Sequence, residues 1–317
     1  MKVIVTGGAG FIGSHLVRAL LDRGESVAVI DDFNAFYDPA LKRENVAPHL
    51  ENPNFSLHEI DIRDLDAVRK AIETERPEVV CHLAARAGVR PSIEEPILYE
   101  EVNCLGTLNI LESVKGLGLK NFVFAASSSV YGLNSKSPFS EEDPITMPIS
   151  PYASTKRAGE LMCFTYSHLY DLPVTCLRFF TVYGEAGRPE MAVAKFTRHI
   201  YDGTELEVYG DGSAVRDFTY IGDIIEGVMG AVYKPFKYEI INIGGSKTID
   251  VSGLISTIED KLGKKAKIKY LEAAPGDVPL TYADVTKAGE LIGYAPKVSV
   301  DEGVARYVKW FLEREAR

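Results

Sequence analysis

Cysteine motifs, an excess of positive charge and long apolar runs are all missing from this chain of 317 residues. The absence of any Cys-x-x-Cys pair disfavours a zinc site or a disulfide framework and indicates reduced, buried thiols. The cysteines concerned are Cys81, Cys104, Cys163 and Cys176. A formal net charge of −10 makes nucleic acid and anionic membrane surfaces poor partners.

No apolar run approaches the roughly 20 residues of a membrane-spanning helix. The chain begins directly with Met-Lys-Val-Ile-Val, a run typical of a strand. We therefore expect no signal peptide, no membrane partner and a cytoplasmic location. Hydrophobic residues make up 46% of the chain, which is enough for one large core or two smaller ones.

Short apolar runs alternate with helical patterns through the first half of the chain. The runs typical of strands are 3–5, 27–30, 79–83, 122–125 and 174–178. Helices are expected at 14–23 and at 65–75, the second with Asp64 as its cap. This alternation predicts an α/β fold with a doubly wound parallel sheet of the Rossmann type.

The amino-acid composition changes after about residue 180, where glycine and proline become frequent. We expect a dinucleotide-binding domain in 1–180 and a smaller, mixed α/β lobe in 181–317 that binds substrate. The segment 217–243 is expected to return to the first domain, so that the boundary is interleaved. Helices of the second lobe are expected at 252–262 and 300–315.

The stretch VTGGAGFIGSH places Gly7, Gly10 and Gly13 directly after the first strand and at the start of a helix. Glycine here permits a tight turn and lets the backbone approach a pyrophosphate at the helix N-terminus. Phe11 and Ile12 lie within the motif and belong to the same expected contact surface. The context favours dinucleotide binding over a merely tight turn.

The second strand ends at Asp31, 18 residues after Gly13, close to the roughly 20-residue spacing of the acid that binds the adenine ribose. A carboxylate there accepts hydrogen bonds from both ribose hydroxyls and repels a 2′-phosphate, so NAD is preferred to NADP. The alternative, a solvated acid at a strand end, weakens only that preference. Further cofactor contacts, each with an ordinary packing alternative, are expected at Asp61, Ile62, Leu83, Ala84 and Ala85.

The stretch PYASTKRAGEL contains Tyr152 and Lys156, whose spacing puts them on one face of a helix. A phenol titrates near 10, so it needs a nearby positive charge to act as a base at neutral pH. The Lys156 ammonium, with the positive nicotinamide, would supply that charge. Such a pair alone often marks a solvated helix face, but here Ser127 precedes it by 25 residues, downstream of a dinucleotide motif.

Together these motifs resemble those of the extended short-chain dehydrogenases/reductases, specifically the nucleotide-sugar 4-epimerases. The resemblance covers essentially the whole chain and includes HLAA at 82–85 and RDFTYIGD at 216–223. It implies that Ser127 hydrogen-bonds the reacting sugar oxygen and that Tyr152 is the acid/base. It also implies that Lys156 binds the ribose and lowers the pKa of Tyr152.

The resemblance further implies that Arg216 binds the UDP phosphates and that Asp277 contacts the uridine ribose. A guanidinium suits phosphate because its fork gives bidentate, charge-assisted bonds. The alternative for Arg216 is an ion pair with Asp217 or Asp223. Leu280 stands where the family often has another arginine, which leaves more of the phosphate binding to Arg216.

The serine run in AASSSVYG separates reactions within this family. In the similar 4,6-dehydratases and UDP-glucuronate decarboxylases, an acidic residue follows shortly after the catalytic hydroxyl. Here Ser128 and Ser129 follow Ser127, and neither can do that acid/base work at neutral pH, so dehydration and decarboxylation are disfavoured. Hydroxyls can instead donate to a sugar carboxylate without repelling it, or simply cap the strand end.

Thr181 stands where most UDP-glucose 4-epimerases have asparagine and where UDP-glucuronate 4-epimerases have threonine. The stretches 36–45 and 187–192 also resemble the second group. By this match Ser128, Ser129 and Thr181 hold the uronate, with Arg188 near its carboxylate or the UDP; the alternative for Arg188 is a surface charge on a loop.

Two departures from the family bear on the sugar. The pair Glu185-Ala186 adds a negative charge near an anionic ligand, and Thr281 replaces a bulky tyrosine that limits the 2-substituent in some epimerases.

These patterns predict an NAD-dependent enzyme that interconverts UDP-glucuronate and UDP-galacturonate through a 4-keto sugar. That ketone is β to the carboxylate, so our hypothesis is that the serines and Thr181 hold the carboxylate out of the alignment in which carbon dioxide is lost. A UDP-glucose/galactose or N-acetylhexosamine 4-epimerase remains an alternative. So does a non-catalytic NAD-sensing scaffold, which would not need Ser127, Tyr152 and Lys156 together. The segments 106–114 and 152–170 match helices that pair in family homodimers, so a homodimer is expected.

Overall fold

The main sheet has seven strands in the order β3-β2-β1-β4-β5-β6-β11 in a computed structural model that describes residues 1–272 and 278–316. Every neighbouring pair is parallel, which confirms the expected doubly wound sheet. The strands are β1 (Lys2–Thr6), β2 (Ser26–Asp31), β3 (Phe55–Glu59), β4 (Val79–His82), β5 (Asn121–Ser127), β6 (Val174–Phe179) and β11 (Tyr238–Ile243).

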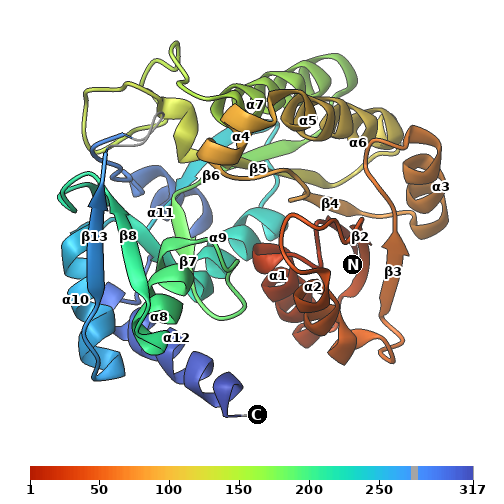
Figure 1. The fold of residues 1–317 in the computed structure, drawn as a ribbon. Coiled ribbons are helices and arrows are strands. Elements are labelled where there is room, and N and C mark those ends of the chain that lie inside the picture. The colour runs from red at the N-terminus through yellow and green to blue at the C-terminus, as the bar shows by residue number, and fades with distance from the viewer. Residues whose placement is uncertain (273–277, 317) are drawn as a thin grey trace.

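Helices cover both faces of this sheet (Figure 1). On one face α1 (Phe11–Asp22) packs beside α9 (Ile221–Tyr233). On the other lie α3 (Leu65–Glu75), α6 (Gly106–Val114) and α7 (Pro151–Tyr170). Strand β1 shows why its sequence is apolar without alternation: Val3 and Val5 enter one core cluster and Ile4 enters the other.

Helix α3 illustrates how local sequence sets the bounds of an element. Its N-cap is Asp64, whose carboxylate accepts a hydrogen bond from the backbone N–H of Ala67 at 3.0 Å. The helix ends at Glu75, and Arg76 follows in the left-handed conformation. The expected span of 65–75 is therefore confirmed.

Shorter elements follow the carboxyl ends of the strands. They are α2 (Pro39–Val46), η1 (Ala47–His49), α4 (Val89–Glu94), α5 (Pro96–Glu100), the π-helical turn η2 (Glu101–Leu105) and the 3-10 turn η3 (Ser128–Tyr131). Among the helices of the described residues, none combines the length and the apolar character that crossing a membrane requires.

Outside the main sheet and its flanking helices, the described chain after residue 180 is built from strand pairs and helices. These strands are β7 (Thr181–Tyr183) with β10 (Phe218–Tyr220), β8 (Glu205–Tyr209) with β13 (Lys267–Leu271), both parallel, and β9 (Val215–Arg216) with β12 (Ile249–Asp250), antiparallel. These helices are α8 (Ala192–Asp202), α10 (Val251–Leu262), α11 (Thr286–Ile292) and α12 (Val300–Glu315). Helix α10 packs against α8 and α12, at the lower left of Figure 1.

The strand order reverses direction between β1 and β4. In open α/β sheets, ligands bind outside the carboxyl ends of the strands at such a switch point. The glycine motif follows β1, and the segment Leu83-Ala84-Ala85 follows β4. The fold therefore places both stretches at the edge where a ligand is expected.

Candidate functional site

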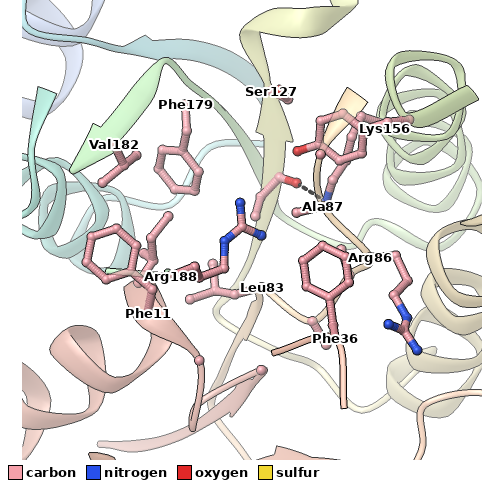
Figure 2. Close-up of a pocket in the computed structure, with 18 of the residues that line it drawn as sticks. Phe11, Phe36, Leu83, Arg86, Ala87, Ser127, Lys156, Phe179, Val182 and Arg188 are labelled. Atoms are coloured by element: carbon pink, nitrogen blue, oxygen red, sulfur yellow. Dashed lines mark hydrogen bonds between the residues drawn. The ribbon is translucent and has the colours of Figure 1, made fainter. Parts of the chain in front are cut away.

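A cavity of about 430 Å³ lies along the carboxyl edge of the sheet. Its lining includes the site residues named from the sequence: Gly7, Gly10, Phe11, Ile12, Gly13, Asp31, Asp61, Ile62, Leu83, Ala84, Ala85, Ser127, Ser128, Ser129, Tyr152, Lys156, Thr181, Arg188 and Arg216. Asp277 lies outside the described residues. Segments far apart in the chain thus meet in one cavity, part of which Figure 2 shows from close by.

The glycine motif leaves no room for side chains. Gly7 has φ +70°, and a Cβ on it would lie 2.8 Å from the backbone nitrogen of Ala84. A Cβ on Gly13 would lie 2.1 Å from the carbonyl oxygen of Gly7. Gly10 is the N-cap of α1, and no side chain caps this helix. The result is a close-packed helix N-terminus that can accept an anion such as a pyrophosphate.

Asp31 is buried, with 7% of its surface exposed. Its two carboxylate oxygens accept from the backbone N–H groups of Ala9 at 3.1 Å and Phe33 at 2.9 Å. Burial raises the pKa of Asp31, while these hydrogen bonds oppose the rise. Each oxygen keeps acceptor capacity, so the carboxylate can still receive ribose hydroxyls. Asp61, in contrast, is paired with Arg63 at 2.6 Å.

Tyr37 and Lys42 line the same cavity as Asp31. The Tyr37 hydroxyl is buried without a hydrogen-bond partner among the described residues. Lys42 is 5% exposed and donates to the carbonyl oxygen of Asn34 at 3.0 Å. The glycine motif, the Asp31 carboxylate and the Tyr37 hydroxyl together fit a bound dinucleotide: the first accepts a pyrophosphate, and the other two can hydrogen-bond its polar groups. Sequence reasoning noted this stretch only as part of the family resemblance.

Asn103 supports the wall of the cavity, and sequence reasoning missed it. Its amide accepts from the backbone N–H of Arg86 at 2.8 Å and donates to the Thr155 hydroxyl at 3.0 Å. It thereby ties the loop after β4 to helix α7. The available signal in the sequence was an asparagine inside an apolar helical pattern, because asparagine is unfavourable in the interior of a helix. In the structure this position lies in the π-helical turn η2.

Lys156 is 5% exposed and donates to the carbonyl oxygen of Ala125 at 2.8 Å. Burial lowers the pKa of Lys156 to about 8. The side chain is thus fixed against the end of β5, inside the cavity. It is not on a solvated helix face.

Burial raises the pKa of Tyr152, and two groups act against this rise: a hydrogen bond with Ser127 and the charge of Arg188. From the sequence we expected the Lys156 ammonium, together with the positive nicotinamide, to lower the pKa of this phenol. In the structure Arg188 also acts in that direction, the Lys156 ammonium donates to the carbonyl oxygen of Ala125, and the effect of Lys156 on Tyr152 stays a prediction.

The serine run forms the turn η3 directly after β5. Ser127 is its N-cap and accepts from the backbone N–H of Ser129 at 3.2 Å and from the Ser129 hydroxyl at 2.9 Å. Capping, the alternative weighed for these serines, is therefore what the Ser127 hydroxyl does for the first turn of η3, and Ser129 supplies the donors. Ser128 lines the cavity between them.

Arg188 lies in the centre of the cavity, where the aromatic ring of Phe36 separates it from Arg86 (Figure 2). The two guanidinium carbons are 5.8 Å and 5.6 Å from the Phe36 ring centre, within the range of cation–π attraction. Arg188 also pairs with Glu190 at 3.1 Å. It is therefore part of the cavity and not a surface charge on a loop.

Arg216 lines the cavity as well. The two acids considered as its partners are engaged by backbone groups: Asp217 accepts from the N–H of Gly245 at 2.7 Å, and Asp223 from that of Val298 at 3.0 Å. Glu185, one of the departures from the family's sequence pattern, has a partner within the protein. The hydroxyl of Tyr220 donates to its carboxylate at 2.8 Å.

The charges of the described lining are unevenly placed. Its carboxylates are Asp31, Asp32 and Asp61, which lie at the end of β2 or shortly after β2 and β3. Its cations are Lys42, Arg86, Lys156, Arg188 and Arg216. Neighbouring strands lie about 4.8 Å apart, so the acids after β2 start about three strand spacings from Ser127 at the end of β5. An acidic chain thus offers a cationic site for anionic ligands.

Comparison with known proteins gives a consistent picture. The family described as GDP-mannose 4,6 dehydratase matches residues 4–307. A UDP-glucuronate 4-epimerase of Thermodesulfobacterium geofontis is 44% identical over 311 residues, which cover 98% of this chain and 96% of the relative.

Two solved structures are similar over nearly their whole length. One is a UDP-glucuronic acid 4-epimerase from Bacillus cereus in complex with UDP-glucuronic acid and NAD, with TM-score 0.93, 37% identity and coverage of 99% and 100% of the two chains. The other is a UDP-glucose 4-epimerase from Thermotoga maritima with UDP-glucose, with TM-score 0.92, 34% identity and the same coverage. The similarity of the backbones therefore does not decide between UDP-glucuronic acid and UDP-glucose as the ligand of this chain.

Proposed function

The chain belongs to the GDP-mannose 4,6-dehydratase family of extended short-chain dehydrogenases/reductases, and on this premise we propose that it interconverts UDP-glucuronate and UDP-galacturonate by epimerisation at carbon 4. The observation that carries the choice is the serine turn. Ser127, Ser128 and Ser129 line the substrate end, whereas the carboxylates of the described lining lie at the cofactor end. Dehydration needs an acid close to the sugar, and this arrangement does not supply one.

NAD is the cofactor of this proposal, held by the glycine motif and Asp31, and when bound it supplies the hydride acceptor and donor. Tyr152 takes the proton from the 4-hydroxyl of the sugar and later returns it. Ser127 donates a hydrogen bond to the same oxygen. Arg188 holds positive charge near the phenol, and Lys156, in the same cavity, is proposed to add a second positive charge there. Because oxidation and reduction occur at the same carbon, there is no net redox change.

The carboxylate of the sugar needs its own restraint, because the 4-keto intermediate is a β-keto acid. Ser128 and Thr181 line the cavity and can donate to this carboxylate. Ser129 can join them only by withdrawing its hydroxyl from Ser127. Arg188 and Arg216 are the proposed ligands of the diphosphate or the carboxylate, with Asp277 proposed for the uridine ribose.

A neutral or N-acetylated hexose is the second candidate. Thr281 lines the substrate end, and its small side chain leaves room for a bulky 2-substituent. The 34% identity to the UDP-glucose 4-epimerase of Thermotoga maritima is only slightly lower than the 37% to the uronate enzyme. A non-catalytic scaffold has no need of Ser127, Tyr152 and Lys156 in one cavity.

We also propose a cytoplasmic homodimer that pairs through α6 and α7. Leu108 on α6 is 36% exposed, and Leu161 and Phe164 on α7 are each 51% exposed. Large apolar side chains gathered on neighbouring helices favour a partner of the same kind. A measurement of mass by light scattering tests this, and a monomer at micromolar concentration would contradict it.

The deciding experiment for the reaction is incubation of the purified protein, without added cofactor, with UDP-glucuronate, followed by proton NMR. The expected product is UDP-galacturonate, which requires NAD that was retained during purification. A UDP-pentose product would mean that the serine turn does not prevent loss of carbon dioxide. Conversion of UDP-glucose alone under the same conditions would establish the neutral-sugar alternative.

A further inference from the structure

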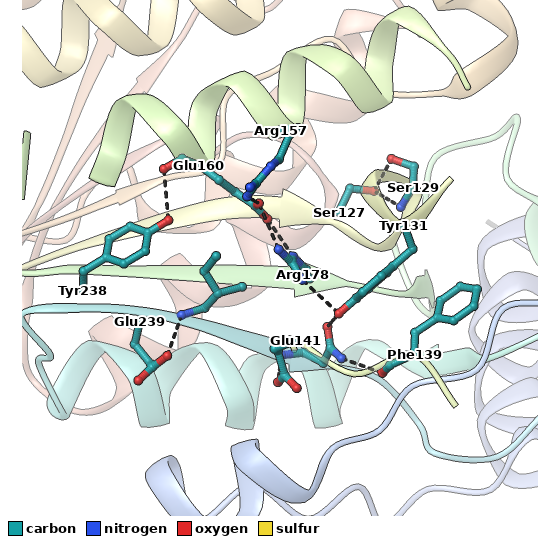
Figure 3. A network of polar contacts seen from close by, with 12 residues as sticks. Ser127, Ser129, Tyr131, Phe139, Glu141, Arg157, Glu160, Arg178, Tyr238 and Glu239 are labelled. Atoms are coloured by element: carbon teal, nitrogen blue, oxygen red, sulfur yellow. Dashed lines mark hydrogen bonds and ion pairs between the residues drawn. The ribbon is translucent and has the colours of Figure 1, made fainter. Parts of the chain in front are cut away.

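A buried ion pair lies behind the serine turn (Figure 3). Arg178, in β6, is 1% exposed, and Glu160, in α7, is 0% exposed. Their contact is bidentate, with Nε to Oε1 at 2.7 Å and Nη2 to Oε2 at 3.0 Å. Glu160 lies two turns along the same helix from Tyr152. One end of the pair is therefore attached to the element that carries the proposed base.

The other end of the pair reaches the turn that carries Ser127. Nη1 of Arg178 donates to the hydroxyl of Tyr131 at 3.0 Å, and that hydroxyl donates to Oδ1 of Asn242 at 2.7 Å. Tyr131 is the last residue of η3, the turn that Ser127 caps. Arg178 also sits in register between Ala126 of β5 and Asn242 of β11.

The energetics call for a role beyond stability. Removing two charges from water is costly, and a buried ion pair can often be replaced by apolar residues without loss of stability. Such a pair does fix the orientation of both side chains, because the guanidinium and the carboxylate form their two hydrogen bonds in only one relative geometry. Arg178 has to satisfy Glu160 and Tyr131 at once, so it fixes the distance between α7 and η3.

We infer that Glu160, Arg178 and Tyr131 are positioning residues that set the separation of Ser127 and Tyr152. This inference rests on the proposed function, in which both hydroxyls meet one sugar oxygen before and after the sugar turns over. Because the sugar turns over in the cavity, the hydroxyls of Ser127 and Tyr152 must keep a constant separation to meet the same oxygen again. A displacement of about 1 Å can cost on the order of 100-fold in rate.

The test is Tyr131→Phe, which removes the shared hydroxyl and keeps the ring that packs 4.9 Å from Phe139. The expected kcat falls about tenfold or more, with KM for UDP-glucuronate little changed. Some 4-keto sugar leaves before its hydride is returned. That sugar has lost a hydride to NAD and a proton, so reduced nicotinamide remains on the protein and is measured by its near-ultraviolet absorbance.

The matched control is Tyr294→Phe. Tyr294 is also buried, and its hydroxyl donates to the carbonyl oxygen of Gly244 at 2.8 Å. This variant loses one buried hydrogen bond outside the network, and we expect a lower Tm with unchanged kcat and no accumulation of reduced nicotinamide. Equal effects of the two variants on kcat and on the absorbance would overturn the inference, as would wild-type kcat in Tyr131→Phe.

A second variant guards against misfolding of the first. In the double variant Glu160→Met with Arg178→Met, both buried charges disappear together. Arg157, which also pairs with Glu160 at 2.8 Å, has a side chain that is 30% exposed and remains hydrated. It is expected to keep a Tm near that of the wild type while kcat falls and reduced nicotinamide accumulates. A stable double variant with wild-type kcat would also reject the positioning role. If the wild type turns over only UDP-glucose, all variants are assayed with that sugar, so that failure of the proposed substrate stays distinguishable from failure of this inference.

Discussion

The hydroxyl of Ser129 donates to the hydroxyl of Ser127 at 2.9 Å, and the backbone N–H of Ser129 donates to the same oxygen at 3.2 Å. Both bonds use the acceptor capacity of Ser127, so its own proton is left to point elsewhere. The hydrogen bond between Ser127 and Tyr152 lowers the pKa of the phenol. The three adjacent serines therefore have different roles, and substitutions at each of them should affect turnover differently.

Ser129→Ala and Ser128→Ala are expected to differ in their dependence on the sugar. Because Ser129 acts on Ser127, its loss should lower kcat several-fold for UDP-glucuronate and for any neutral sugar alike. Loss of Ser128 should lower turnover of the uronate selectively and release some UDP-pentose. Rates for both sugars, with products assigned by NMR, check this. Equal sugar dependence in the two variants would reject the division of roles.

Arg188→Met is expected to move the acidic limb of the pH profile of kcat to higher pH. The Arg188 charge favours the phenolate of Tyr152, so its removal raises the pKa of the phenol, and less base is present at neutral pH. Among the described residues, Ser127 also acts on this phenol through a hydrogen bond, the ring centre of Tyr99 is 6.3 Å from that of Tyr152, and Lys156 lines the same cavity. The control is Arg188→Lys, which keeps the charge; superimposable limbs for the two variants would contradict the assignment.

Some features of this molecule follow from local sequence alone. The cap of α3 at Asp64 and the glycine turn after β1 are determined within a few residues, and both were expected. Strand β3 was missed, because its sequence FSLHE mixes polar and apolar residues at the sheet edge. The division into domains 1–180 and 181–317 stays a prediction.

Other features depend on contacts between distant segments. Asn103 meets Thr155 across 52 positions of the chain, and Tyr131 meets Asn242 across 111. No local pattern specifies such pairs, because the sequence around one residue, even an unusual one such as Asn103, does not identify its distant partner. The same reason explains why the sequence did not predict that the charge of Arg188 favours the phenolate of Tyr152.

Gly13→Ala is expected to abolish retention of the cofactor, since the added Cβ would lie 2.1 Å from the carbonyl oxygen of Gly7. That oxygen belongs to the backbone of the turn, so the turn itself must shift. At Gly10 the corresponding distance is 3.2 Å, and Gly10→Ala should retain part of the cofactor. The measurement is NAD released from the purified, denatured protein. Full occupancy in Gly13→Ala would show that the glycine motif does not hold the pyrophosphate.

The titration of Lys156 should appear in the stability of the cofactor-free protein. Burial lowers the pKa of Lys156 from 10.5 to about 8 in the folded state. Between these two pH values the unfolded chain binds a proton that the folded chain has released, so the free energy of unfolding rises with pH across this window. Below about pH 8 both states are protonated, and the contribution is constant.

Tyrosines also titrate near the upper end of that window, so the informative quantity is the difference between the wild type and Lys156→Met. This difference should change steadily from about pH 8 to 10.5 in denaturant titrations of protein stripped of NAD. Lys309→Met, at a side chain that is 80% exposed, should give no such change. A flat difference for Lys156→Met would mean that its ammonium is not desolvated at the end of β5, and that the hydrogen bond to Ala125 does not confine it there.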